Sequence, residues 1–398
     1  MMDAQPLYDL SPALQLMALG VVVALGPLAW VWLRNRQASA ARRLSALTLL
    51  TLFLTFDLVL FGAFTRLTDS GLGCPDWPGC YGQASPLGAR AEITQAQAAM
   101  PTGPVTHGKA WIEMIHRYLA SGVGVLILTL AAATWWLRRR GTGEQAAVLN
   151  PWWPTATLVW VCLQGAFGAL TVTMKLFPAI VTLHLLGGLV LLALLCRQAV
   201  SYAQAKDGRA PLALPPALRA GLAAGFALLW LQIALGGWVS TNYAVLACAE
   251  FPACQGQWWP PMDFRQGFEL WRELGKSGSG EHISFAALTA IHYAHRLAAY
   301  LVLAVLALLA WRLHGAGLRH QARWMAGLAA LQLATGLSNV VLGWPLLAAV
   351  GHTGGAAALV VVFTWAWCES ASSPLPLGEG GVRARGARPY PEGEGVRP

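Results

Sequence analysis

Nine apolar stretches, each about as long as a membrane-spanning helix, constrain the fold of this chain more than any other feature. A helix needs roughly 20 apolar residues to cross a bilayer, and 56% of the 398 residues are hydrophobic while 11% are charged. Barrel strands would instead alternate apolar and polar side chains over about ten positions. The sequence therefore predicts an all-α polytopic membrane protein with spans near residues 12–33, 45–66, 111–137, 152–172, 179–198, 217–241, 284–312, 323–343 and 348–368.

Basic residues between these spans predict how the chain is oriented. Lys and Arg are enriched in cytoplasmic loops, and in the nine-span arrangement the basic clusters all fall on one side. They are Arg34, Arg36, Arg42 and Arg43, then Arg138, Arg139 and Arg140, then Arg197, Lys206 and Arg209, and finally Arg312, Arg319 and Arg323. The net charge of +9 therefore mostly reflects the orientation of the chain in the membrane. It predicts a protein that contacts membrane lipid and no nucleic acid.

An internal duplication predicts how the spans are grouped. Cys74 and Cys80 in GLGCPDWPGCYG recur 174 residues later as Cys248 and Cys254 in VLACAEFPACQG. Gln164 and Gln332 open two similar tracts, and each is followed 20 residues later by a histidine, His184 or His352. A third matched step reads Glu113-Met-Ile-His116-Arg117 in one copy and His292-Tyr-Ala-His295-Arg296 in the other. These matches predict an eight-helix bundle built from two tandem four-helix repeats, plus one extra N-terminal transmembrane helix.

The same pattern divides the chain into five parts. We expect the extra helix and a basic cytoplasmic linker over residues 1–44, the first repeat over 45–200, a cytoplasmic linker over 201–216 and the second repeat over 217–368. The last part, 369–398, is rich in Pro, Gly, Arg and Glu and has few large apolar residues. Such a composition buries too little surface to fold, so we expect a disordered cytoplasmic tail.

Four histidines at matched positions, His116 and His184 in the first repeat and His295 and His352 in the second, indicate the chemistry. One membrane histidine alone often only bonds a neighbouring helix. Two matched pairs favour metal ligation, because two imidazoles on facing helices can clamp a haem iron between them. Zinc is less favoured, since it takes three or four protein ligands. His292 competes with His295, although the repeat register and the shared His-Arg step favour His295.

The repeat is broken where the first copy has Glu113 and the second has His292. A carboxylate inside a membrane is costly and suggests function, so Glu113 is a candidate proton relay one turn from His116. A buried hydrogen-bonding role is the alternative. Arg117 and Arg296 follow the candidate ligands and could pair with haem propionates or anchor their helices. The extracytoplasmic loops permit disulfides, which predicts Cys74–Cys80 and Cys248–Cys254 as structural or redox-active bridges.

The run FGAFTRLTDSGLGCPDWPGCYG, followed by EMIHRYLA, LQGAFGALTV and His184, and a second copy ending at His352, resembles the haem A synthase family over residues 46–368. The resemblance implies an enzyme that oxidises a methyl group of haem O to a formyl group by successive hydroxylations. It implies that His116 and His184 flank the substrate haem O with Glu113 beside it, and that His295 and His352 hold a haem b cofactor. It further implies a bacterial cytoplasmic (inner) membrane location and partnership with a haem O synthase and cytochrome oxidase assembly factors, and it leaves open whether the chain forms a homo-oligomer.

Two other functions fit the paired histidines. A dihaem b-type cytochrome would pass electrons across the membrane to quinone or thiol carriers, with two unaltered haems bound permanently. A haem exporter or chaperone would use the first site for transit and release its haem unchanged. The chemical form of the haem bound by the chain separates these hypotheses from an enzyme.

Overall fold

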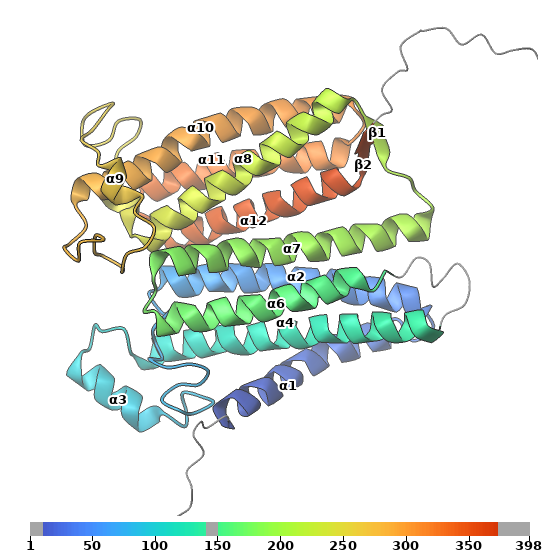
Figure 1. Cartoon of the computed structure of the whole chain (residues 1–398), viewed down its shortest axis with the longest axis horizontal. Coiled ribbons are helices and arrows are strands. Elements are labelled where there is room, and N and C mark those ends of the chain that lie inside the picture. The colour runs from blue at the N-terminus through green and yellow to red at the C-terminus, as the bar shows by residue number, and fades with distance from the viewer. Residues whose placement is uncertain (1–10, 141–149, 373–398) are drawn as a thin grey trace, which may run out of the picture.

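The computed structural model describes residues 11–140 and 150–372 and is built almost entirely of helices (Figure 1). Nine of the described helices are long and apolar enough to cross a membrane. They are α1 (Ser11–Arg34), α2 (Ala40–Leu67), α4 (His107–Arg140), α6 (Trp152–Thr173), α7 (Pro178–Asp207), α8 (Pro216–Thr241), α10 (Phe285–Gly315), α11 (Arg319–Val341) and α12 (Leu346–Cys368). The predicted all-α polytopic membrane protein is confirmed, with α7 extending nine residues beyond its predicted end.

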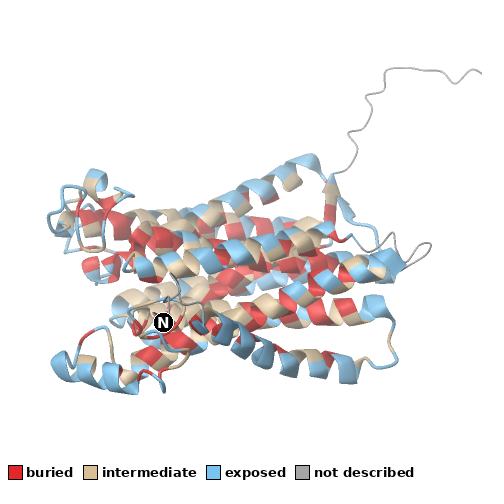
Figure 2. Cartoon of the chain, turned by 60° about the horizontal axis from the view of Figure 1, so that its bottom comes forward, coloured by how far each residue is buried: buried red, intermediate tan, exposed pale blue. Residues whose placement is uncertain are grey.

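Apart from α1, the long helices fall into two groups that lie side by side (Figure 1). We call α2, α4, α6 and α7 the first half, and α8, α10, α11 and α12 the second half. Across the junction, α7 packs against both α8 and α12, and α2 packs against α12. Buried residues gather on the inward sides of the helices, while the outward sides are exposed (Figure 2). Exposed apolar side chains are the expected surface of helices in lipid, because lipid tails are as apolar as Leu.

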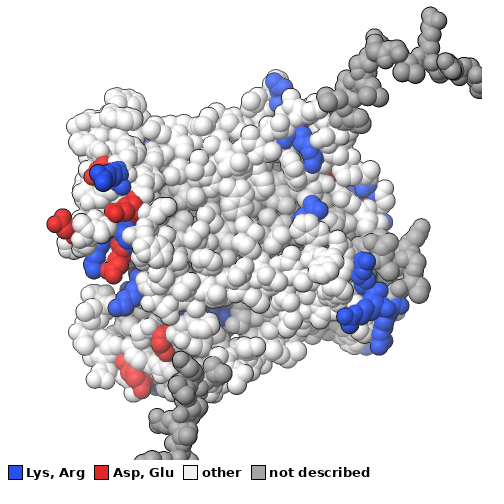
Figure 3. Space-filling model, viewed as in Figure 1, with Lys and Arg blue, Asp and Glu red and all other residues white. Residues whose placement is uncertain are grey.

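Charged side chains gather at the two ends of the bundle, and a broad band between them carries few (Figure 3). The basic clusters lie at one end, and the loops that contain the cysteines lie at the other. The band between the two ends is where the hydrocarbon core of a bilayer would lie.

Helix α1 has no counterpart in the second half and packs mainly on α4. Small residues allow this contact: a side chain on Gly20 would begin 2.6 Å from Cβ of Ser121, and one on Gly122 would begin 2.8 Å from Val23. In the second half, at an offset of 179 residues, Tyr300 and Leu301 replace Ser121 and Gly122. Such large side chains would prevent the close contact that Gly20 and Gly122 allow, and none of the described helices packs on that face of α10 as α1 does on α4.

Short elements complete the ends of the bundle. At the cysteine end these are α3 (Arg90–Ala99), the 3-10 helix η1 (Ala244–Ala247) and α9 (Phe264–Gly267). At the other end, β1 (Leu212–Leu214) pairs in parallel with β2 (Ser370–Ser372). The first residues of the expected tail are therefore paired with the linker before α8, and its remainder, 373–398, lies outside the described residues, as do residues 1–10.

Candidate functional site

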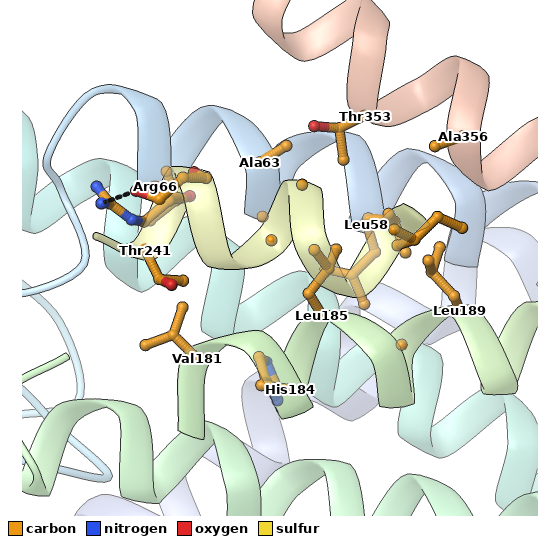
Figure 4. Close-up of a pocket in the computed structure, with 18 of the residues that line it drawn as sticks. Leu58, Ala63, Arg66, Val181, His184, Leu185, Leu189, Thr241, Thr353 and Ala356 are labelled. Atoms are coloured by element: carbon orange, nitrogen blue, oxygen red, sulfur yellow. Dashed lines mark hydrogen bonds between the residues drawn. The ribbon is translucent and has the colours of Figure 1, made fainter. Parts of the chain in front are cut away.

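One cavity of about 1410 Å³ runs through both halves and is lined by all four candidate histidines. Pockets for a single small ligand typically measure roughly 300–1,000 Å³, so this cavity is larger than one small ligand needs. Figure 4 shows its centre, where His184 on α7 lies beneath residues of α2 and α8. The fold thus places all four predicted ligands around one continuous space.

Each histidine ring packs against a glycine of a neighbouring helix. A side chain on Gly62 would begin 3.1 Å from Nε2 of His116, and one on Gly168 would begin 3.5 Å from Cε1 of His184. The second half repeats this arrangement with Gly236 against His295, at 2.9 Å, and Gly336 against His352, at 3.3 Å. A Cβ at Gly236 would collide with its ring, one at Gly62 or Gly336 would press on its ring, and one at Gly168 would only touch it. The glycines thus allow the helices to approach the histidines closely. Sequence reasoning missed them, although both glycine pairs occupy matched positions in the repeat.

The second-half rings are held by hydrogen bonds. Nδ1 of His295 lies 3.0 Å from the side-chain amide of Gln232, and Nδ1 of His352 lies 2.9 Å from the hydroxyl of Thr335. The two rings face each other with centroids 6.4 Å apart and planes at 84°. A partner on one ring nitrogen fixes the orientation of an imidazole and leaves the other nitrogen for a ligand.

The first half lacks these fixing residues. The positions that match Gln232 and Thr335 are Leu58 and Phe167, neither of which can bond an imidazole. Nδ1 of His184 is buried and finds no hydrogen-bond partner in the described parts of the chain. Ring contact replaces hydrogen bonding at His116, which stacks on Phe61 with centroids 6.3 Å apart.

Glu113 is buried and points toward the first disulfide loop. One carboxylate oxygen accepts the backbone N–H of Cys74 at 2.7 Å, and the other accepts from the guanidinium of Arg117. Among the described residues that line the cavity it is the one carboxylate. It therefore connects the cavity beside His116 to the loop above it.

Arg117 and Arg296 bind the disulfide loops, a third role beside the two expected from sequence. Arg117 donates to the carbonyls of Asp76, Pro78 and Gly79. The carbonyls that Arg296 contacts in the second loop are those of Cys248, Glu250, Pro252 and Ala253. Each arginine thus seals its loop onto the helix that carries a candidate ligand.

Both predicted disulfides are present, with Cα atoms 4.9 Å apart for Cys74–Cys80 and 4.8 Å apart for Cys248–Cys254. A two-residue turn follows each bridge, at Tyr81-Gly82 and at Gln255-Gly256, with positive φ at all four residues. Such turns favour glycine at the second position, which is where both loops have it.

His292 occupies the position that matches Glu113. Its Nδ1 lies 3.1 Å from the carbonyl of Ala244, and its Nε2 lies 3.4 Å from Arg296. Both ring nitrogens therefore face protein groups at the loop. His295, one turn further along α10, has the partner ring of His352 in front of it.

The two halves also meet at matched positions near the outer end of α2. Arg66 donates to the carbonyl of Ser240 at 2.6 Å, 174 residues away, and its guanidinium lies 4.1 Å from the ring centroid of Tyr243 (Figure 4 shows the Arg66 bond). The Tyr243 hydroxyl donates to Asp69 at 2.6 Å, also across 174 residues. Burial raises the pKa of the Tyr243 phenol, and the Asp69 carboxylate adds to the shift, so the phenol stays a donor at neutral pH.

Comparison with known proteins places this site in a family. The COX15-CtaA family model, described as cytochrome oxidase assembly protein, matches residues 45–364. A haem A synthase from Shewanella oneidensis is 38% identical over 344 residues, which cover 83% of this chain and 99% of the relative. The chain is a member of the haem A synthase family.

Further haem A synthases share lower identity over most of their length. The protein from Methylobacterium sp. (strain 4-46) is 30% identical and covers 83% of this chain and 92% of its own length. The protein from Halalkalibacterium halodurans is 26% identical, and the match covers 73% of this chain and 85% of the relative. The match to the haem A synthase family model begins after α1 and includes all four histidines, Glu113 and both disulfide loops.

Proposed function

We propose that this chain is a haem A synthase that oxidises a methyl substituent of haem O to a formyl group by successive hydroxylations within the membrane. The family match supports this reaction. The observation that carries the proposal is the arrangement of two histidine pairs around one large apolar cavity, with a carboxylate beside only one of the pairs. A substrate haem and a resident haem need two such pairs with different surroundings.

His295 and His352 fit a resident haem b. Their ring centroids lie 6.4 Å apart, and two imidazoles on facing helices are a ligand set that haem iron takes. Gln232 and Thr335 hold the Nδ1 atoms, which leaves Nε2 of each ring for the iron. When bound there, haem b would supply electron transfer between the substrate half and an external carrier.

His116 and His184 would flank haem O in the first half. Their rings lack the fixing residues of the second half, which suits a ligand that must enter, react and leave. Glu113 would accept a proton beside the reacting methyl group, because Arg117 and the Cys74 N–H hold its carboxylate one helical turn from His116. Arg117 and the disulfide loop would exclude water from that end of the cavity.

The test is mass analysis of haem extracted from the wild type and from Glu113→Ala, each produced in membranes that also make haem O. We expect haem A or a hydroxylated intermediate in the wild type and unmodified haem O in the variant. His292→Ala, which changes the matched residue of the second half, is the control and should keep making product. Haem b alone in all three proteins would indicate an electron-transfer cytochrome and overturn the proposal, and full product from Glu113→Ala would remove Glu113 from the mechanism.

The proposed orientation puts the disulfide loops on the extracytoplasmic side of a bacterial inner membrane, opposite the basic clusters. A membrane-impermeant maleimide applied to intact spheroplasts should label Ala91→Cys in α3 and leave Ala210→Cys, at the other end, unlabelled until the cells are lysed. Labelling of Ala210→Cys but not of Ala91→Cys in intact spheroplasts would show the opposite topology. A haem O synthase would supply the substrate, and cytochrome oxidase assembly factors would receive the product.

A further inference from the structure

The lining of the cavity extends to exposed residues of the first half, and we call this part of it the side groove. Six residues define this side groove: Met17 and Val21 on α1, Ala120 and Gly124 on α4, and Cys162 and Gly165 on α6. Met17 is 63% exposed and Val21 is 46% exposed, although both line the same cavity as His116. The groove therefore connects the candidate substrate site with the lipid.

The floor of the groove is a stripe of small residues along α4. His116, Ala120 and Gly124 follow each other at intervals of four residues, so they lie on one helix face. Leu128 continues the stripe and lines the same cavity. From His116 to Leu128 the stripe runs about 18 Å at the rise of an α-helix, which suits an extended isoprenoid chain.

The glycines of the groove face open space. A side chain added to Gly124 or to Gly165 would meet no atom within 4 Å. Neither glycine is needed for helix packing, and glycine in a helix interior is destabilising by roughly 0.5–1 kcal/mol relative to alanine. The missing side chains of Gly124 and Gly165 therefore widen the groove along α4 and α6.

The second half carries larger side chains at the matching positions. Leu303 stands at the position that matches Gly124, Leu333 at the position that matches Gly165, and Tyr300 at the position that matches Ser121. All three of these larger residues line the cavity near His295 and His352. Helix α1, which forms one wall of the groove, also lacks a second-half counterpart.

We propose that the side groove binds the farnesyl chain of haem O and guides the substrate into the first half from the lipid. This inference rests on the proposed function, since it assigns haem O to the first half. Haem O differs from haem b by that apolar chain, so a groove next to one histidine pair and a filled space next to the other would sort the two haems. The groove is apolar and opens to lipid, which matches a chain that partitions into the membrane.

Leucine substitutions test the groove by giving the first half the residues of the second. Gly124→Leu/Gly165→Leu is compared with the wild type in lipid nanodiscs, with haem b retained in the second half. Each protein is titrated with haem O and with tail-less haem b, and binding is followed by difference absorbance. We expect the variant to bind haem O at least about tenfold more weakly, because a single methylene in a pocket already shifts discrimination by roughly 10–200-fold, while its binding of tail-less haem b stays unchanged.

Gly327→Leu is the matched control, because Gly327 lies on α11 outside the cavity lining and also faces open space. It should bind both haems as the wild type does. If the double variant loses its second-half haem and is therefore misfolded, Val21→Trp narrows the groove from the α1 wall and takes its place in the titration. Unchanged haem O affinity, or an equal loss for both haems, would overturn the proposal.

The same proteins separate this inference from the proposed function. A wild type that prefers haem O but never converts it would leave the groove standing and reject the synthase reaction. A wild type that makes haem A while the groove variants bind haem O normally would keep the reaction and reject the groove.

Discussion

The first and second halves have the same arrangement of helices but differ in the residues that surround their histidines. In the second half, Gln232 and Thr335 fix both rings, and large side chains fill the space beside them. In the first half, leucine and phenylalanine replace these two partners, and glycines leave a groove open to lipid. The difference supports the proposal that the second half holds a resident haem and the first half exchanges its haem.

The largest expected effect is on retention of the resident haem. His352→Ala should yield protein without a bound haem b in the second half, because one of the two proposed ligands is lost. His184→Ala, the matched change in the first half, should purify with haem b still bound. Pyridine haemochrome analysis of the two purified variants measures this, and haem b loss from His184→Ala alone would reverse the assignment of the halves.

A second comparison concerns the arginines beneath the disulfide loops. Arg117→Ala leaves the buried Glu113 carboxylate without its cation, and breaking such a pair costs about 3–5 kcal/mol. Arg296→Ala removes hydrogen bonds to loop carbonyls and to the His292 ring but breaks no ion pair, at about 1–3 kcal/mol. Thermal unfolding followed by circular dichroism should therefore show the larger loss for Arg117→Ala.

The double variant Arg117→Ala/Glu113→Gln provides the control for that comparison. Removing the carboxylate charge should recover part of the stability lost in Arg117→Ala. If Arg117→Ala and Arg296→Ala lost equal stability and the double variant recovered none, the bonds to the loop carbonyls rather than the ion pair would provide the stabilisation.

A smaller effect is expected on haem b dissociation when a hydrogen bond that fixes a second-half ring is removed. Gln232→Leu introduces the residue that the first half has at Leu58, and loss of such a supporting partner typically lowers metal-site affinity by roughly 10–100-fold. The haem b dissociation rate, measured by transfer to excess apomyoglobin, should rise accordingly. Leu58→Gln serves as the converse change, and it should leave that rate unaltered because it lies in the other half.

The smallest effect concerns the contact between the halves at Tyr243. Tyr243→Phe removes one hydrogen bond to the partly exposed Asp69, and we expect a loss of about 0.5–1.5 kcal/mol. The cation–π contact with Arg66 remains in this variant. A loss as large as that of Arg117→Ala would instead make this junction a main source of stability.

The sequence by itself determined the class of fold and the candidate ligands. Run length and apolar content specify membrane helices because backbone polar groups in lipid must bond within the helix, and all nine predicted spans are helices in the structure. The duplication also identified four matched histidines and both cysteine pairs, because a repeat preserves spacing that is visible in one dimension. The assignment of those histidines as haem ligands stays a prediction.

Only the tertiary structure decided what surrounds each of these residues. Gln232 lies 63 residues from His295, and Arg117 lies 38 to 41 residues from the loop carbonyls that it binds, so neither contact follows from local spacing. The groove beside α1 depends on three separate helices. Helix packing in membranes is set by small residues and buried polar bonds rather than by apolar periodicity. Which small or polar residues make these contacts is known only once the neighbouring helix is known.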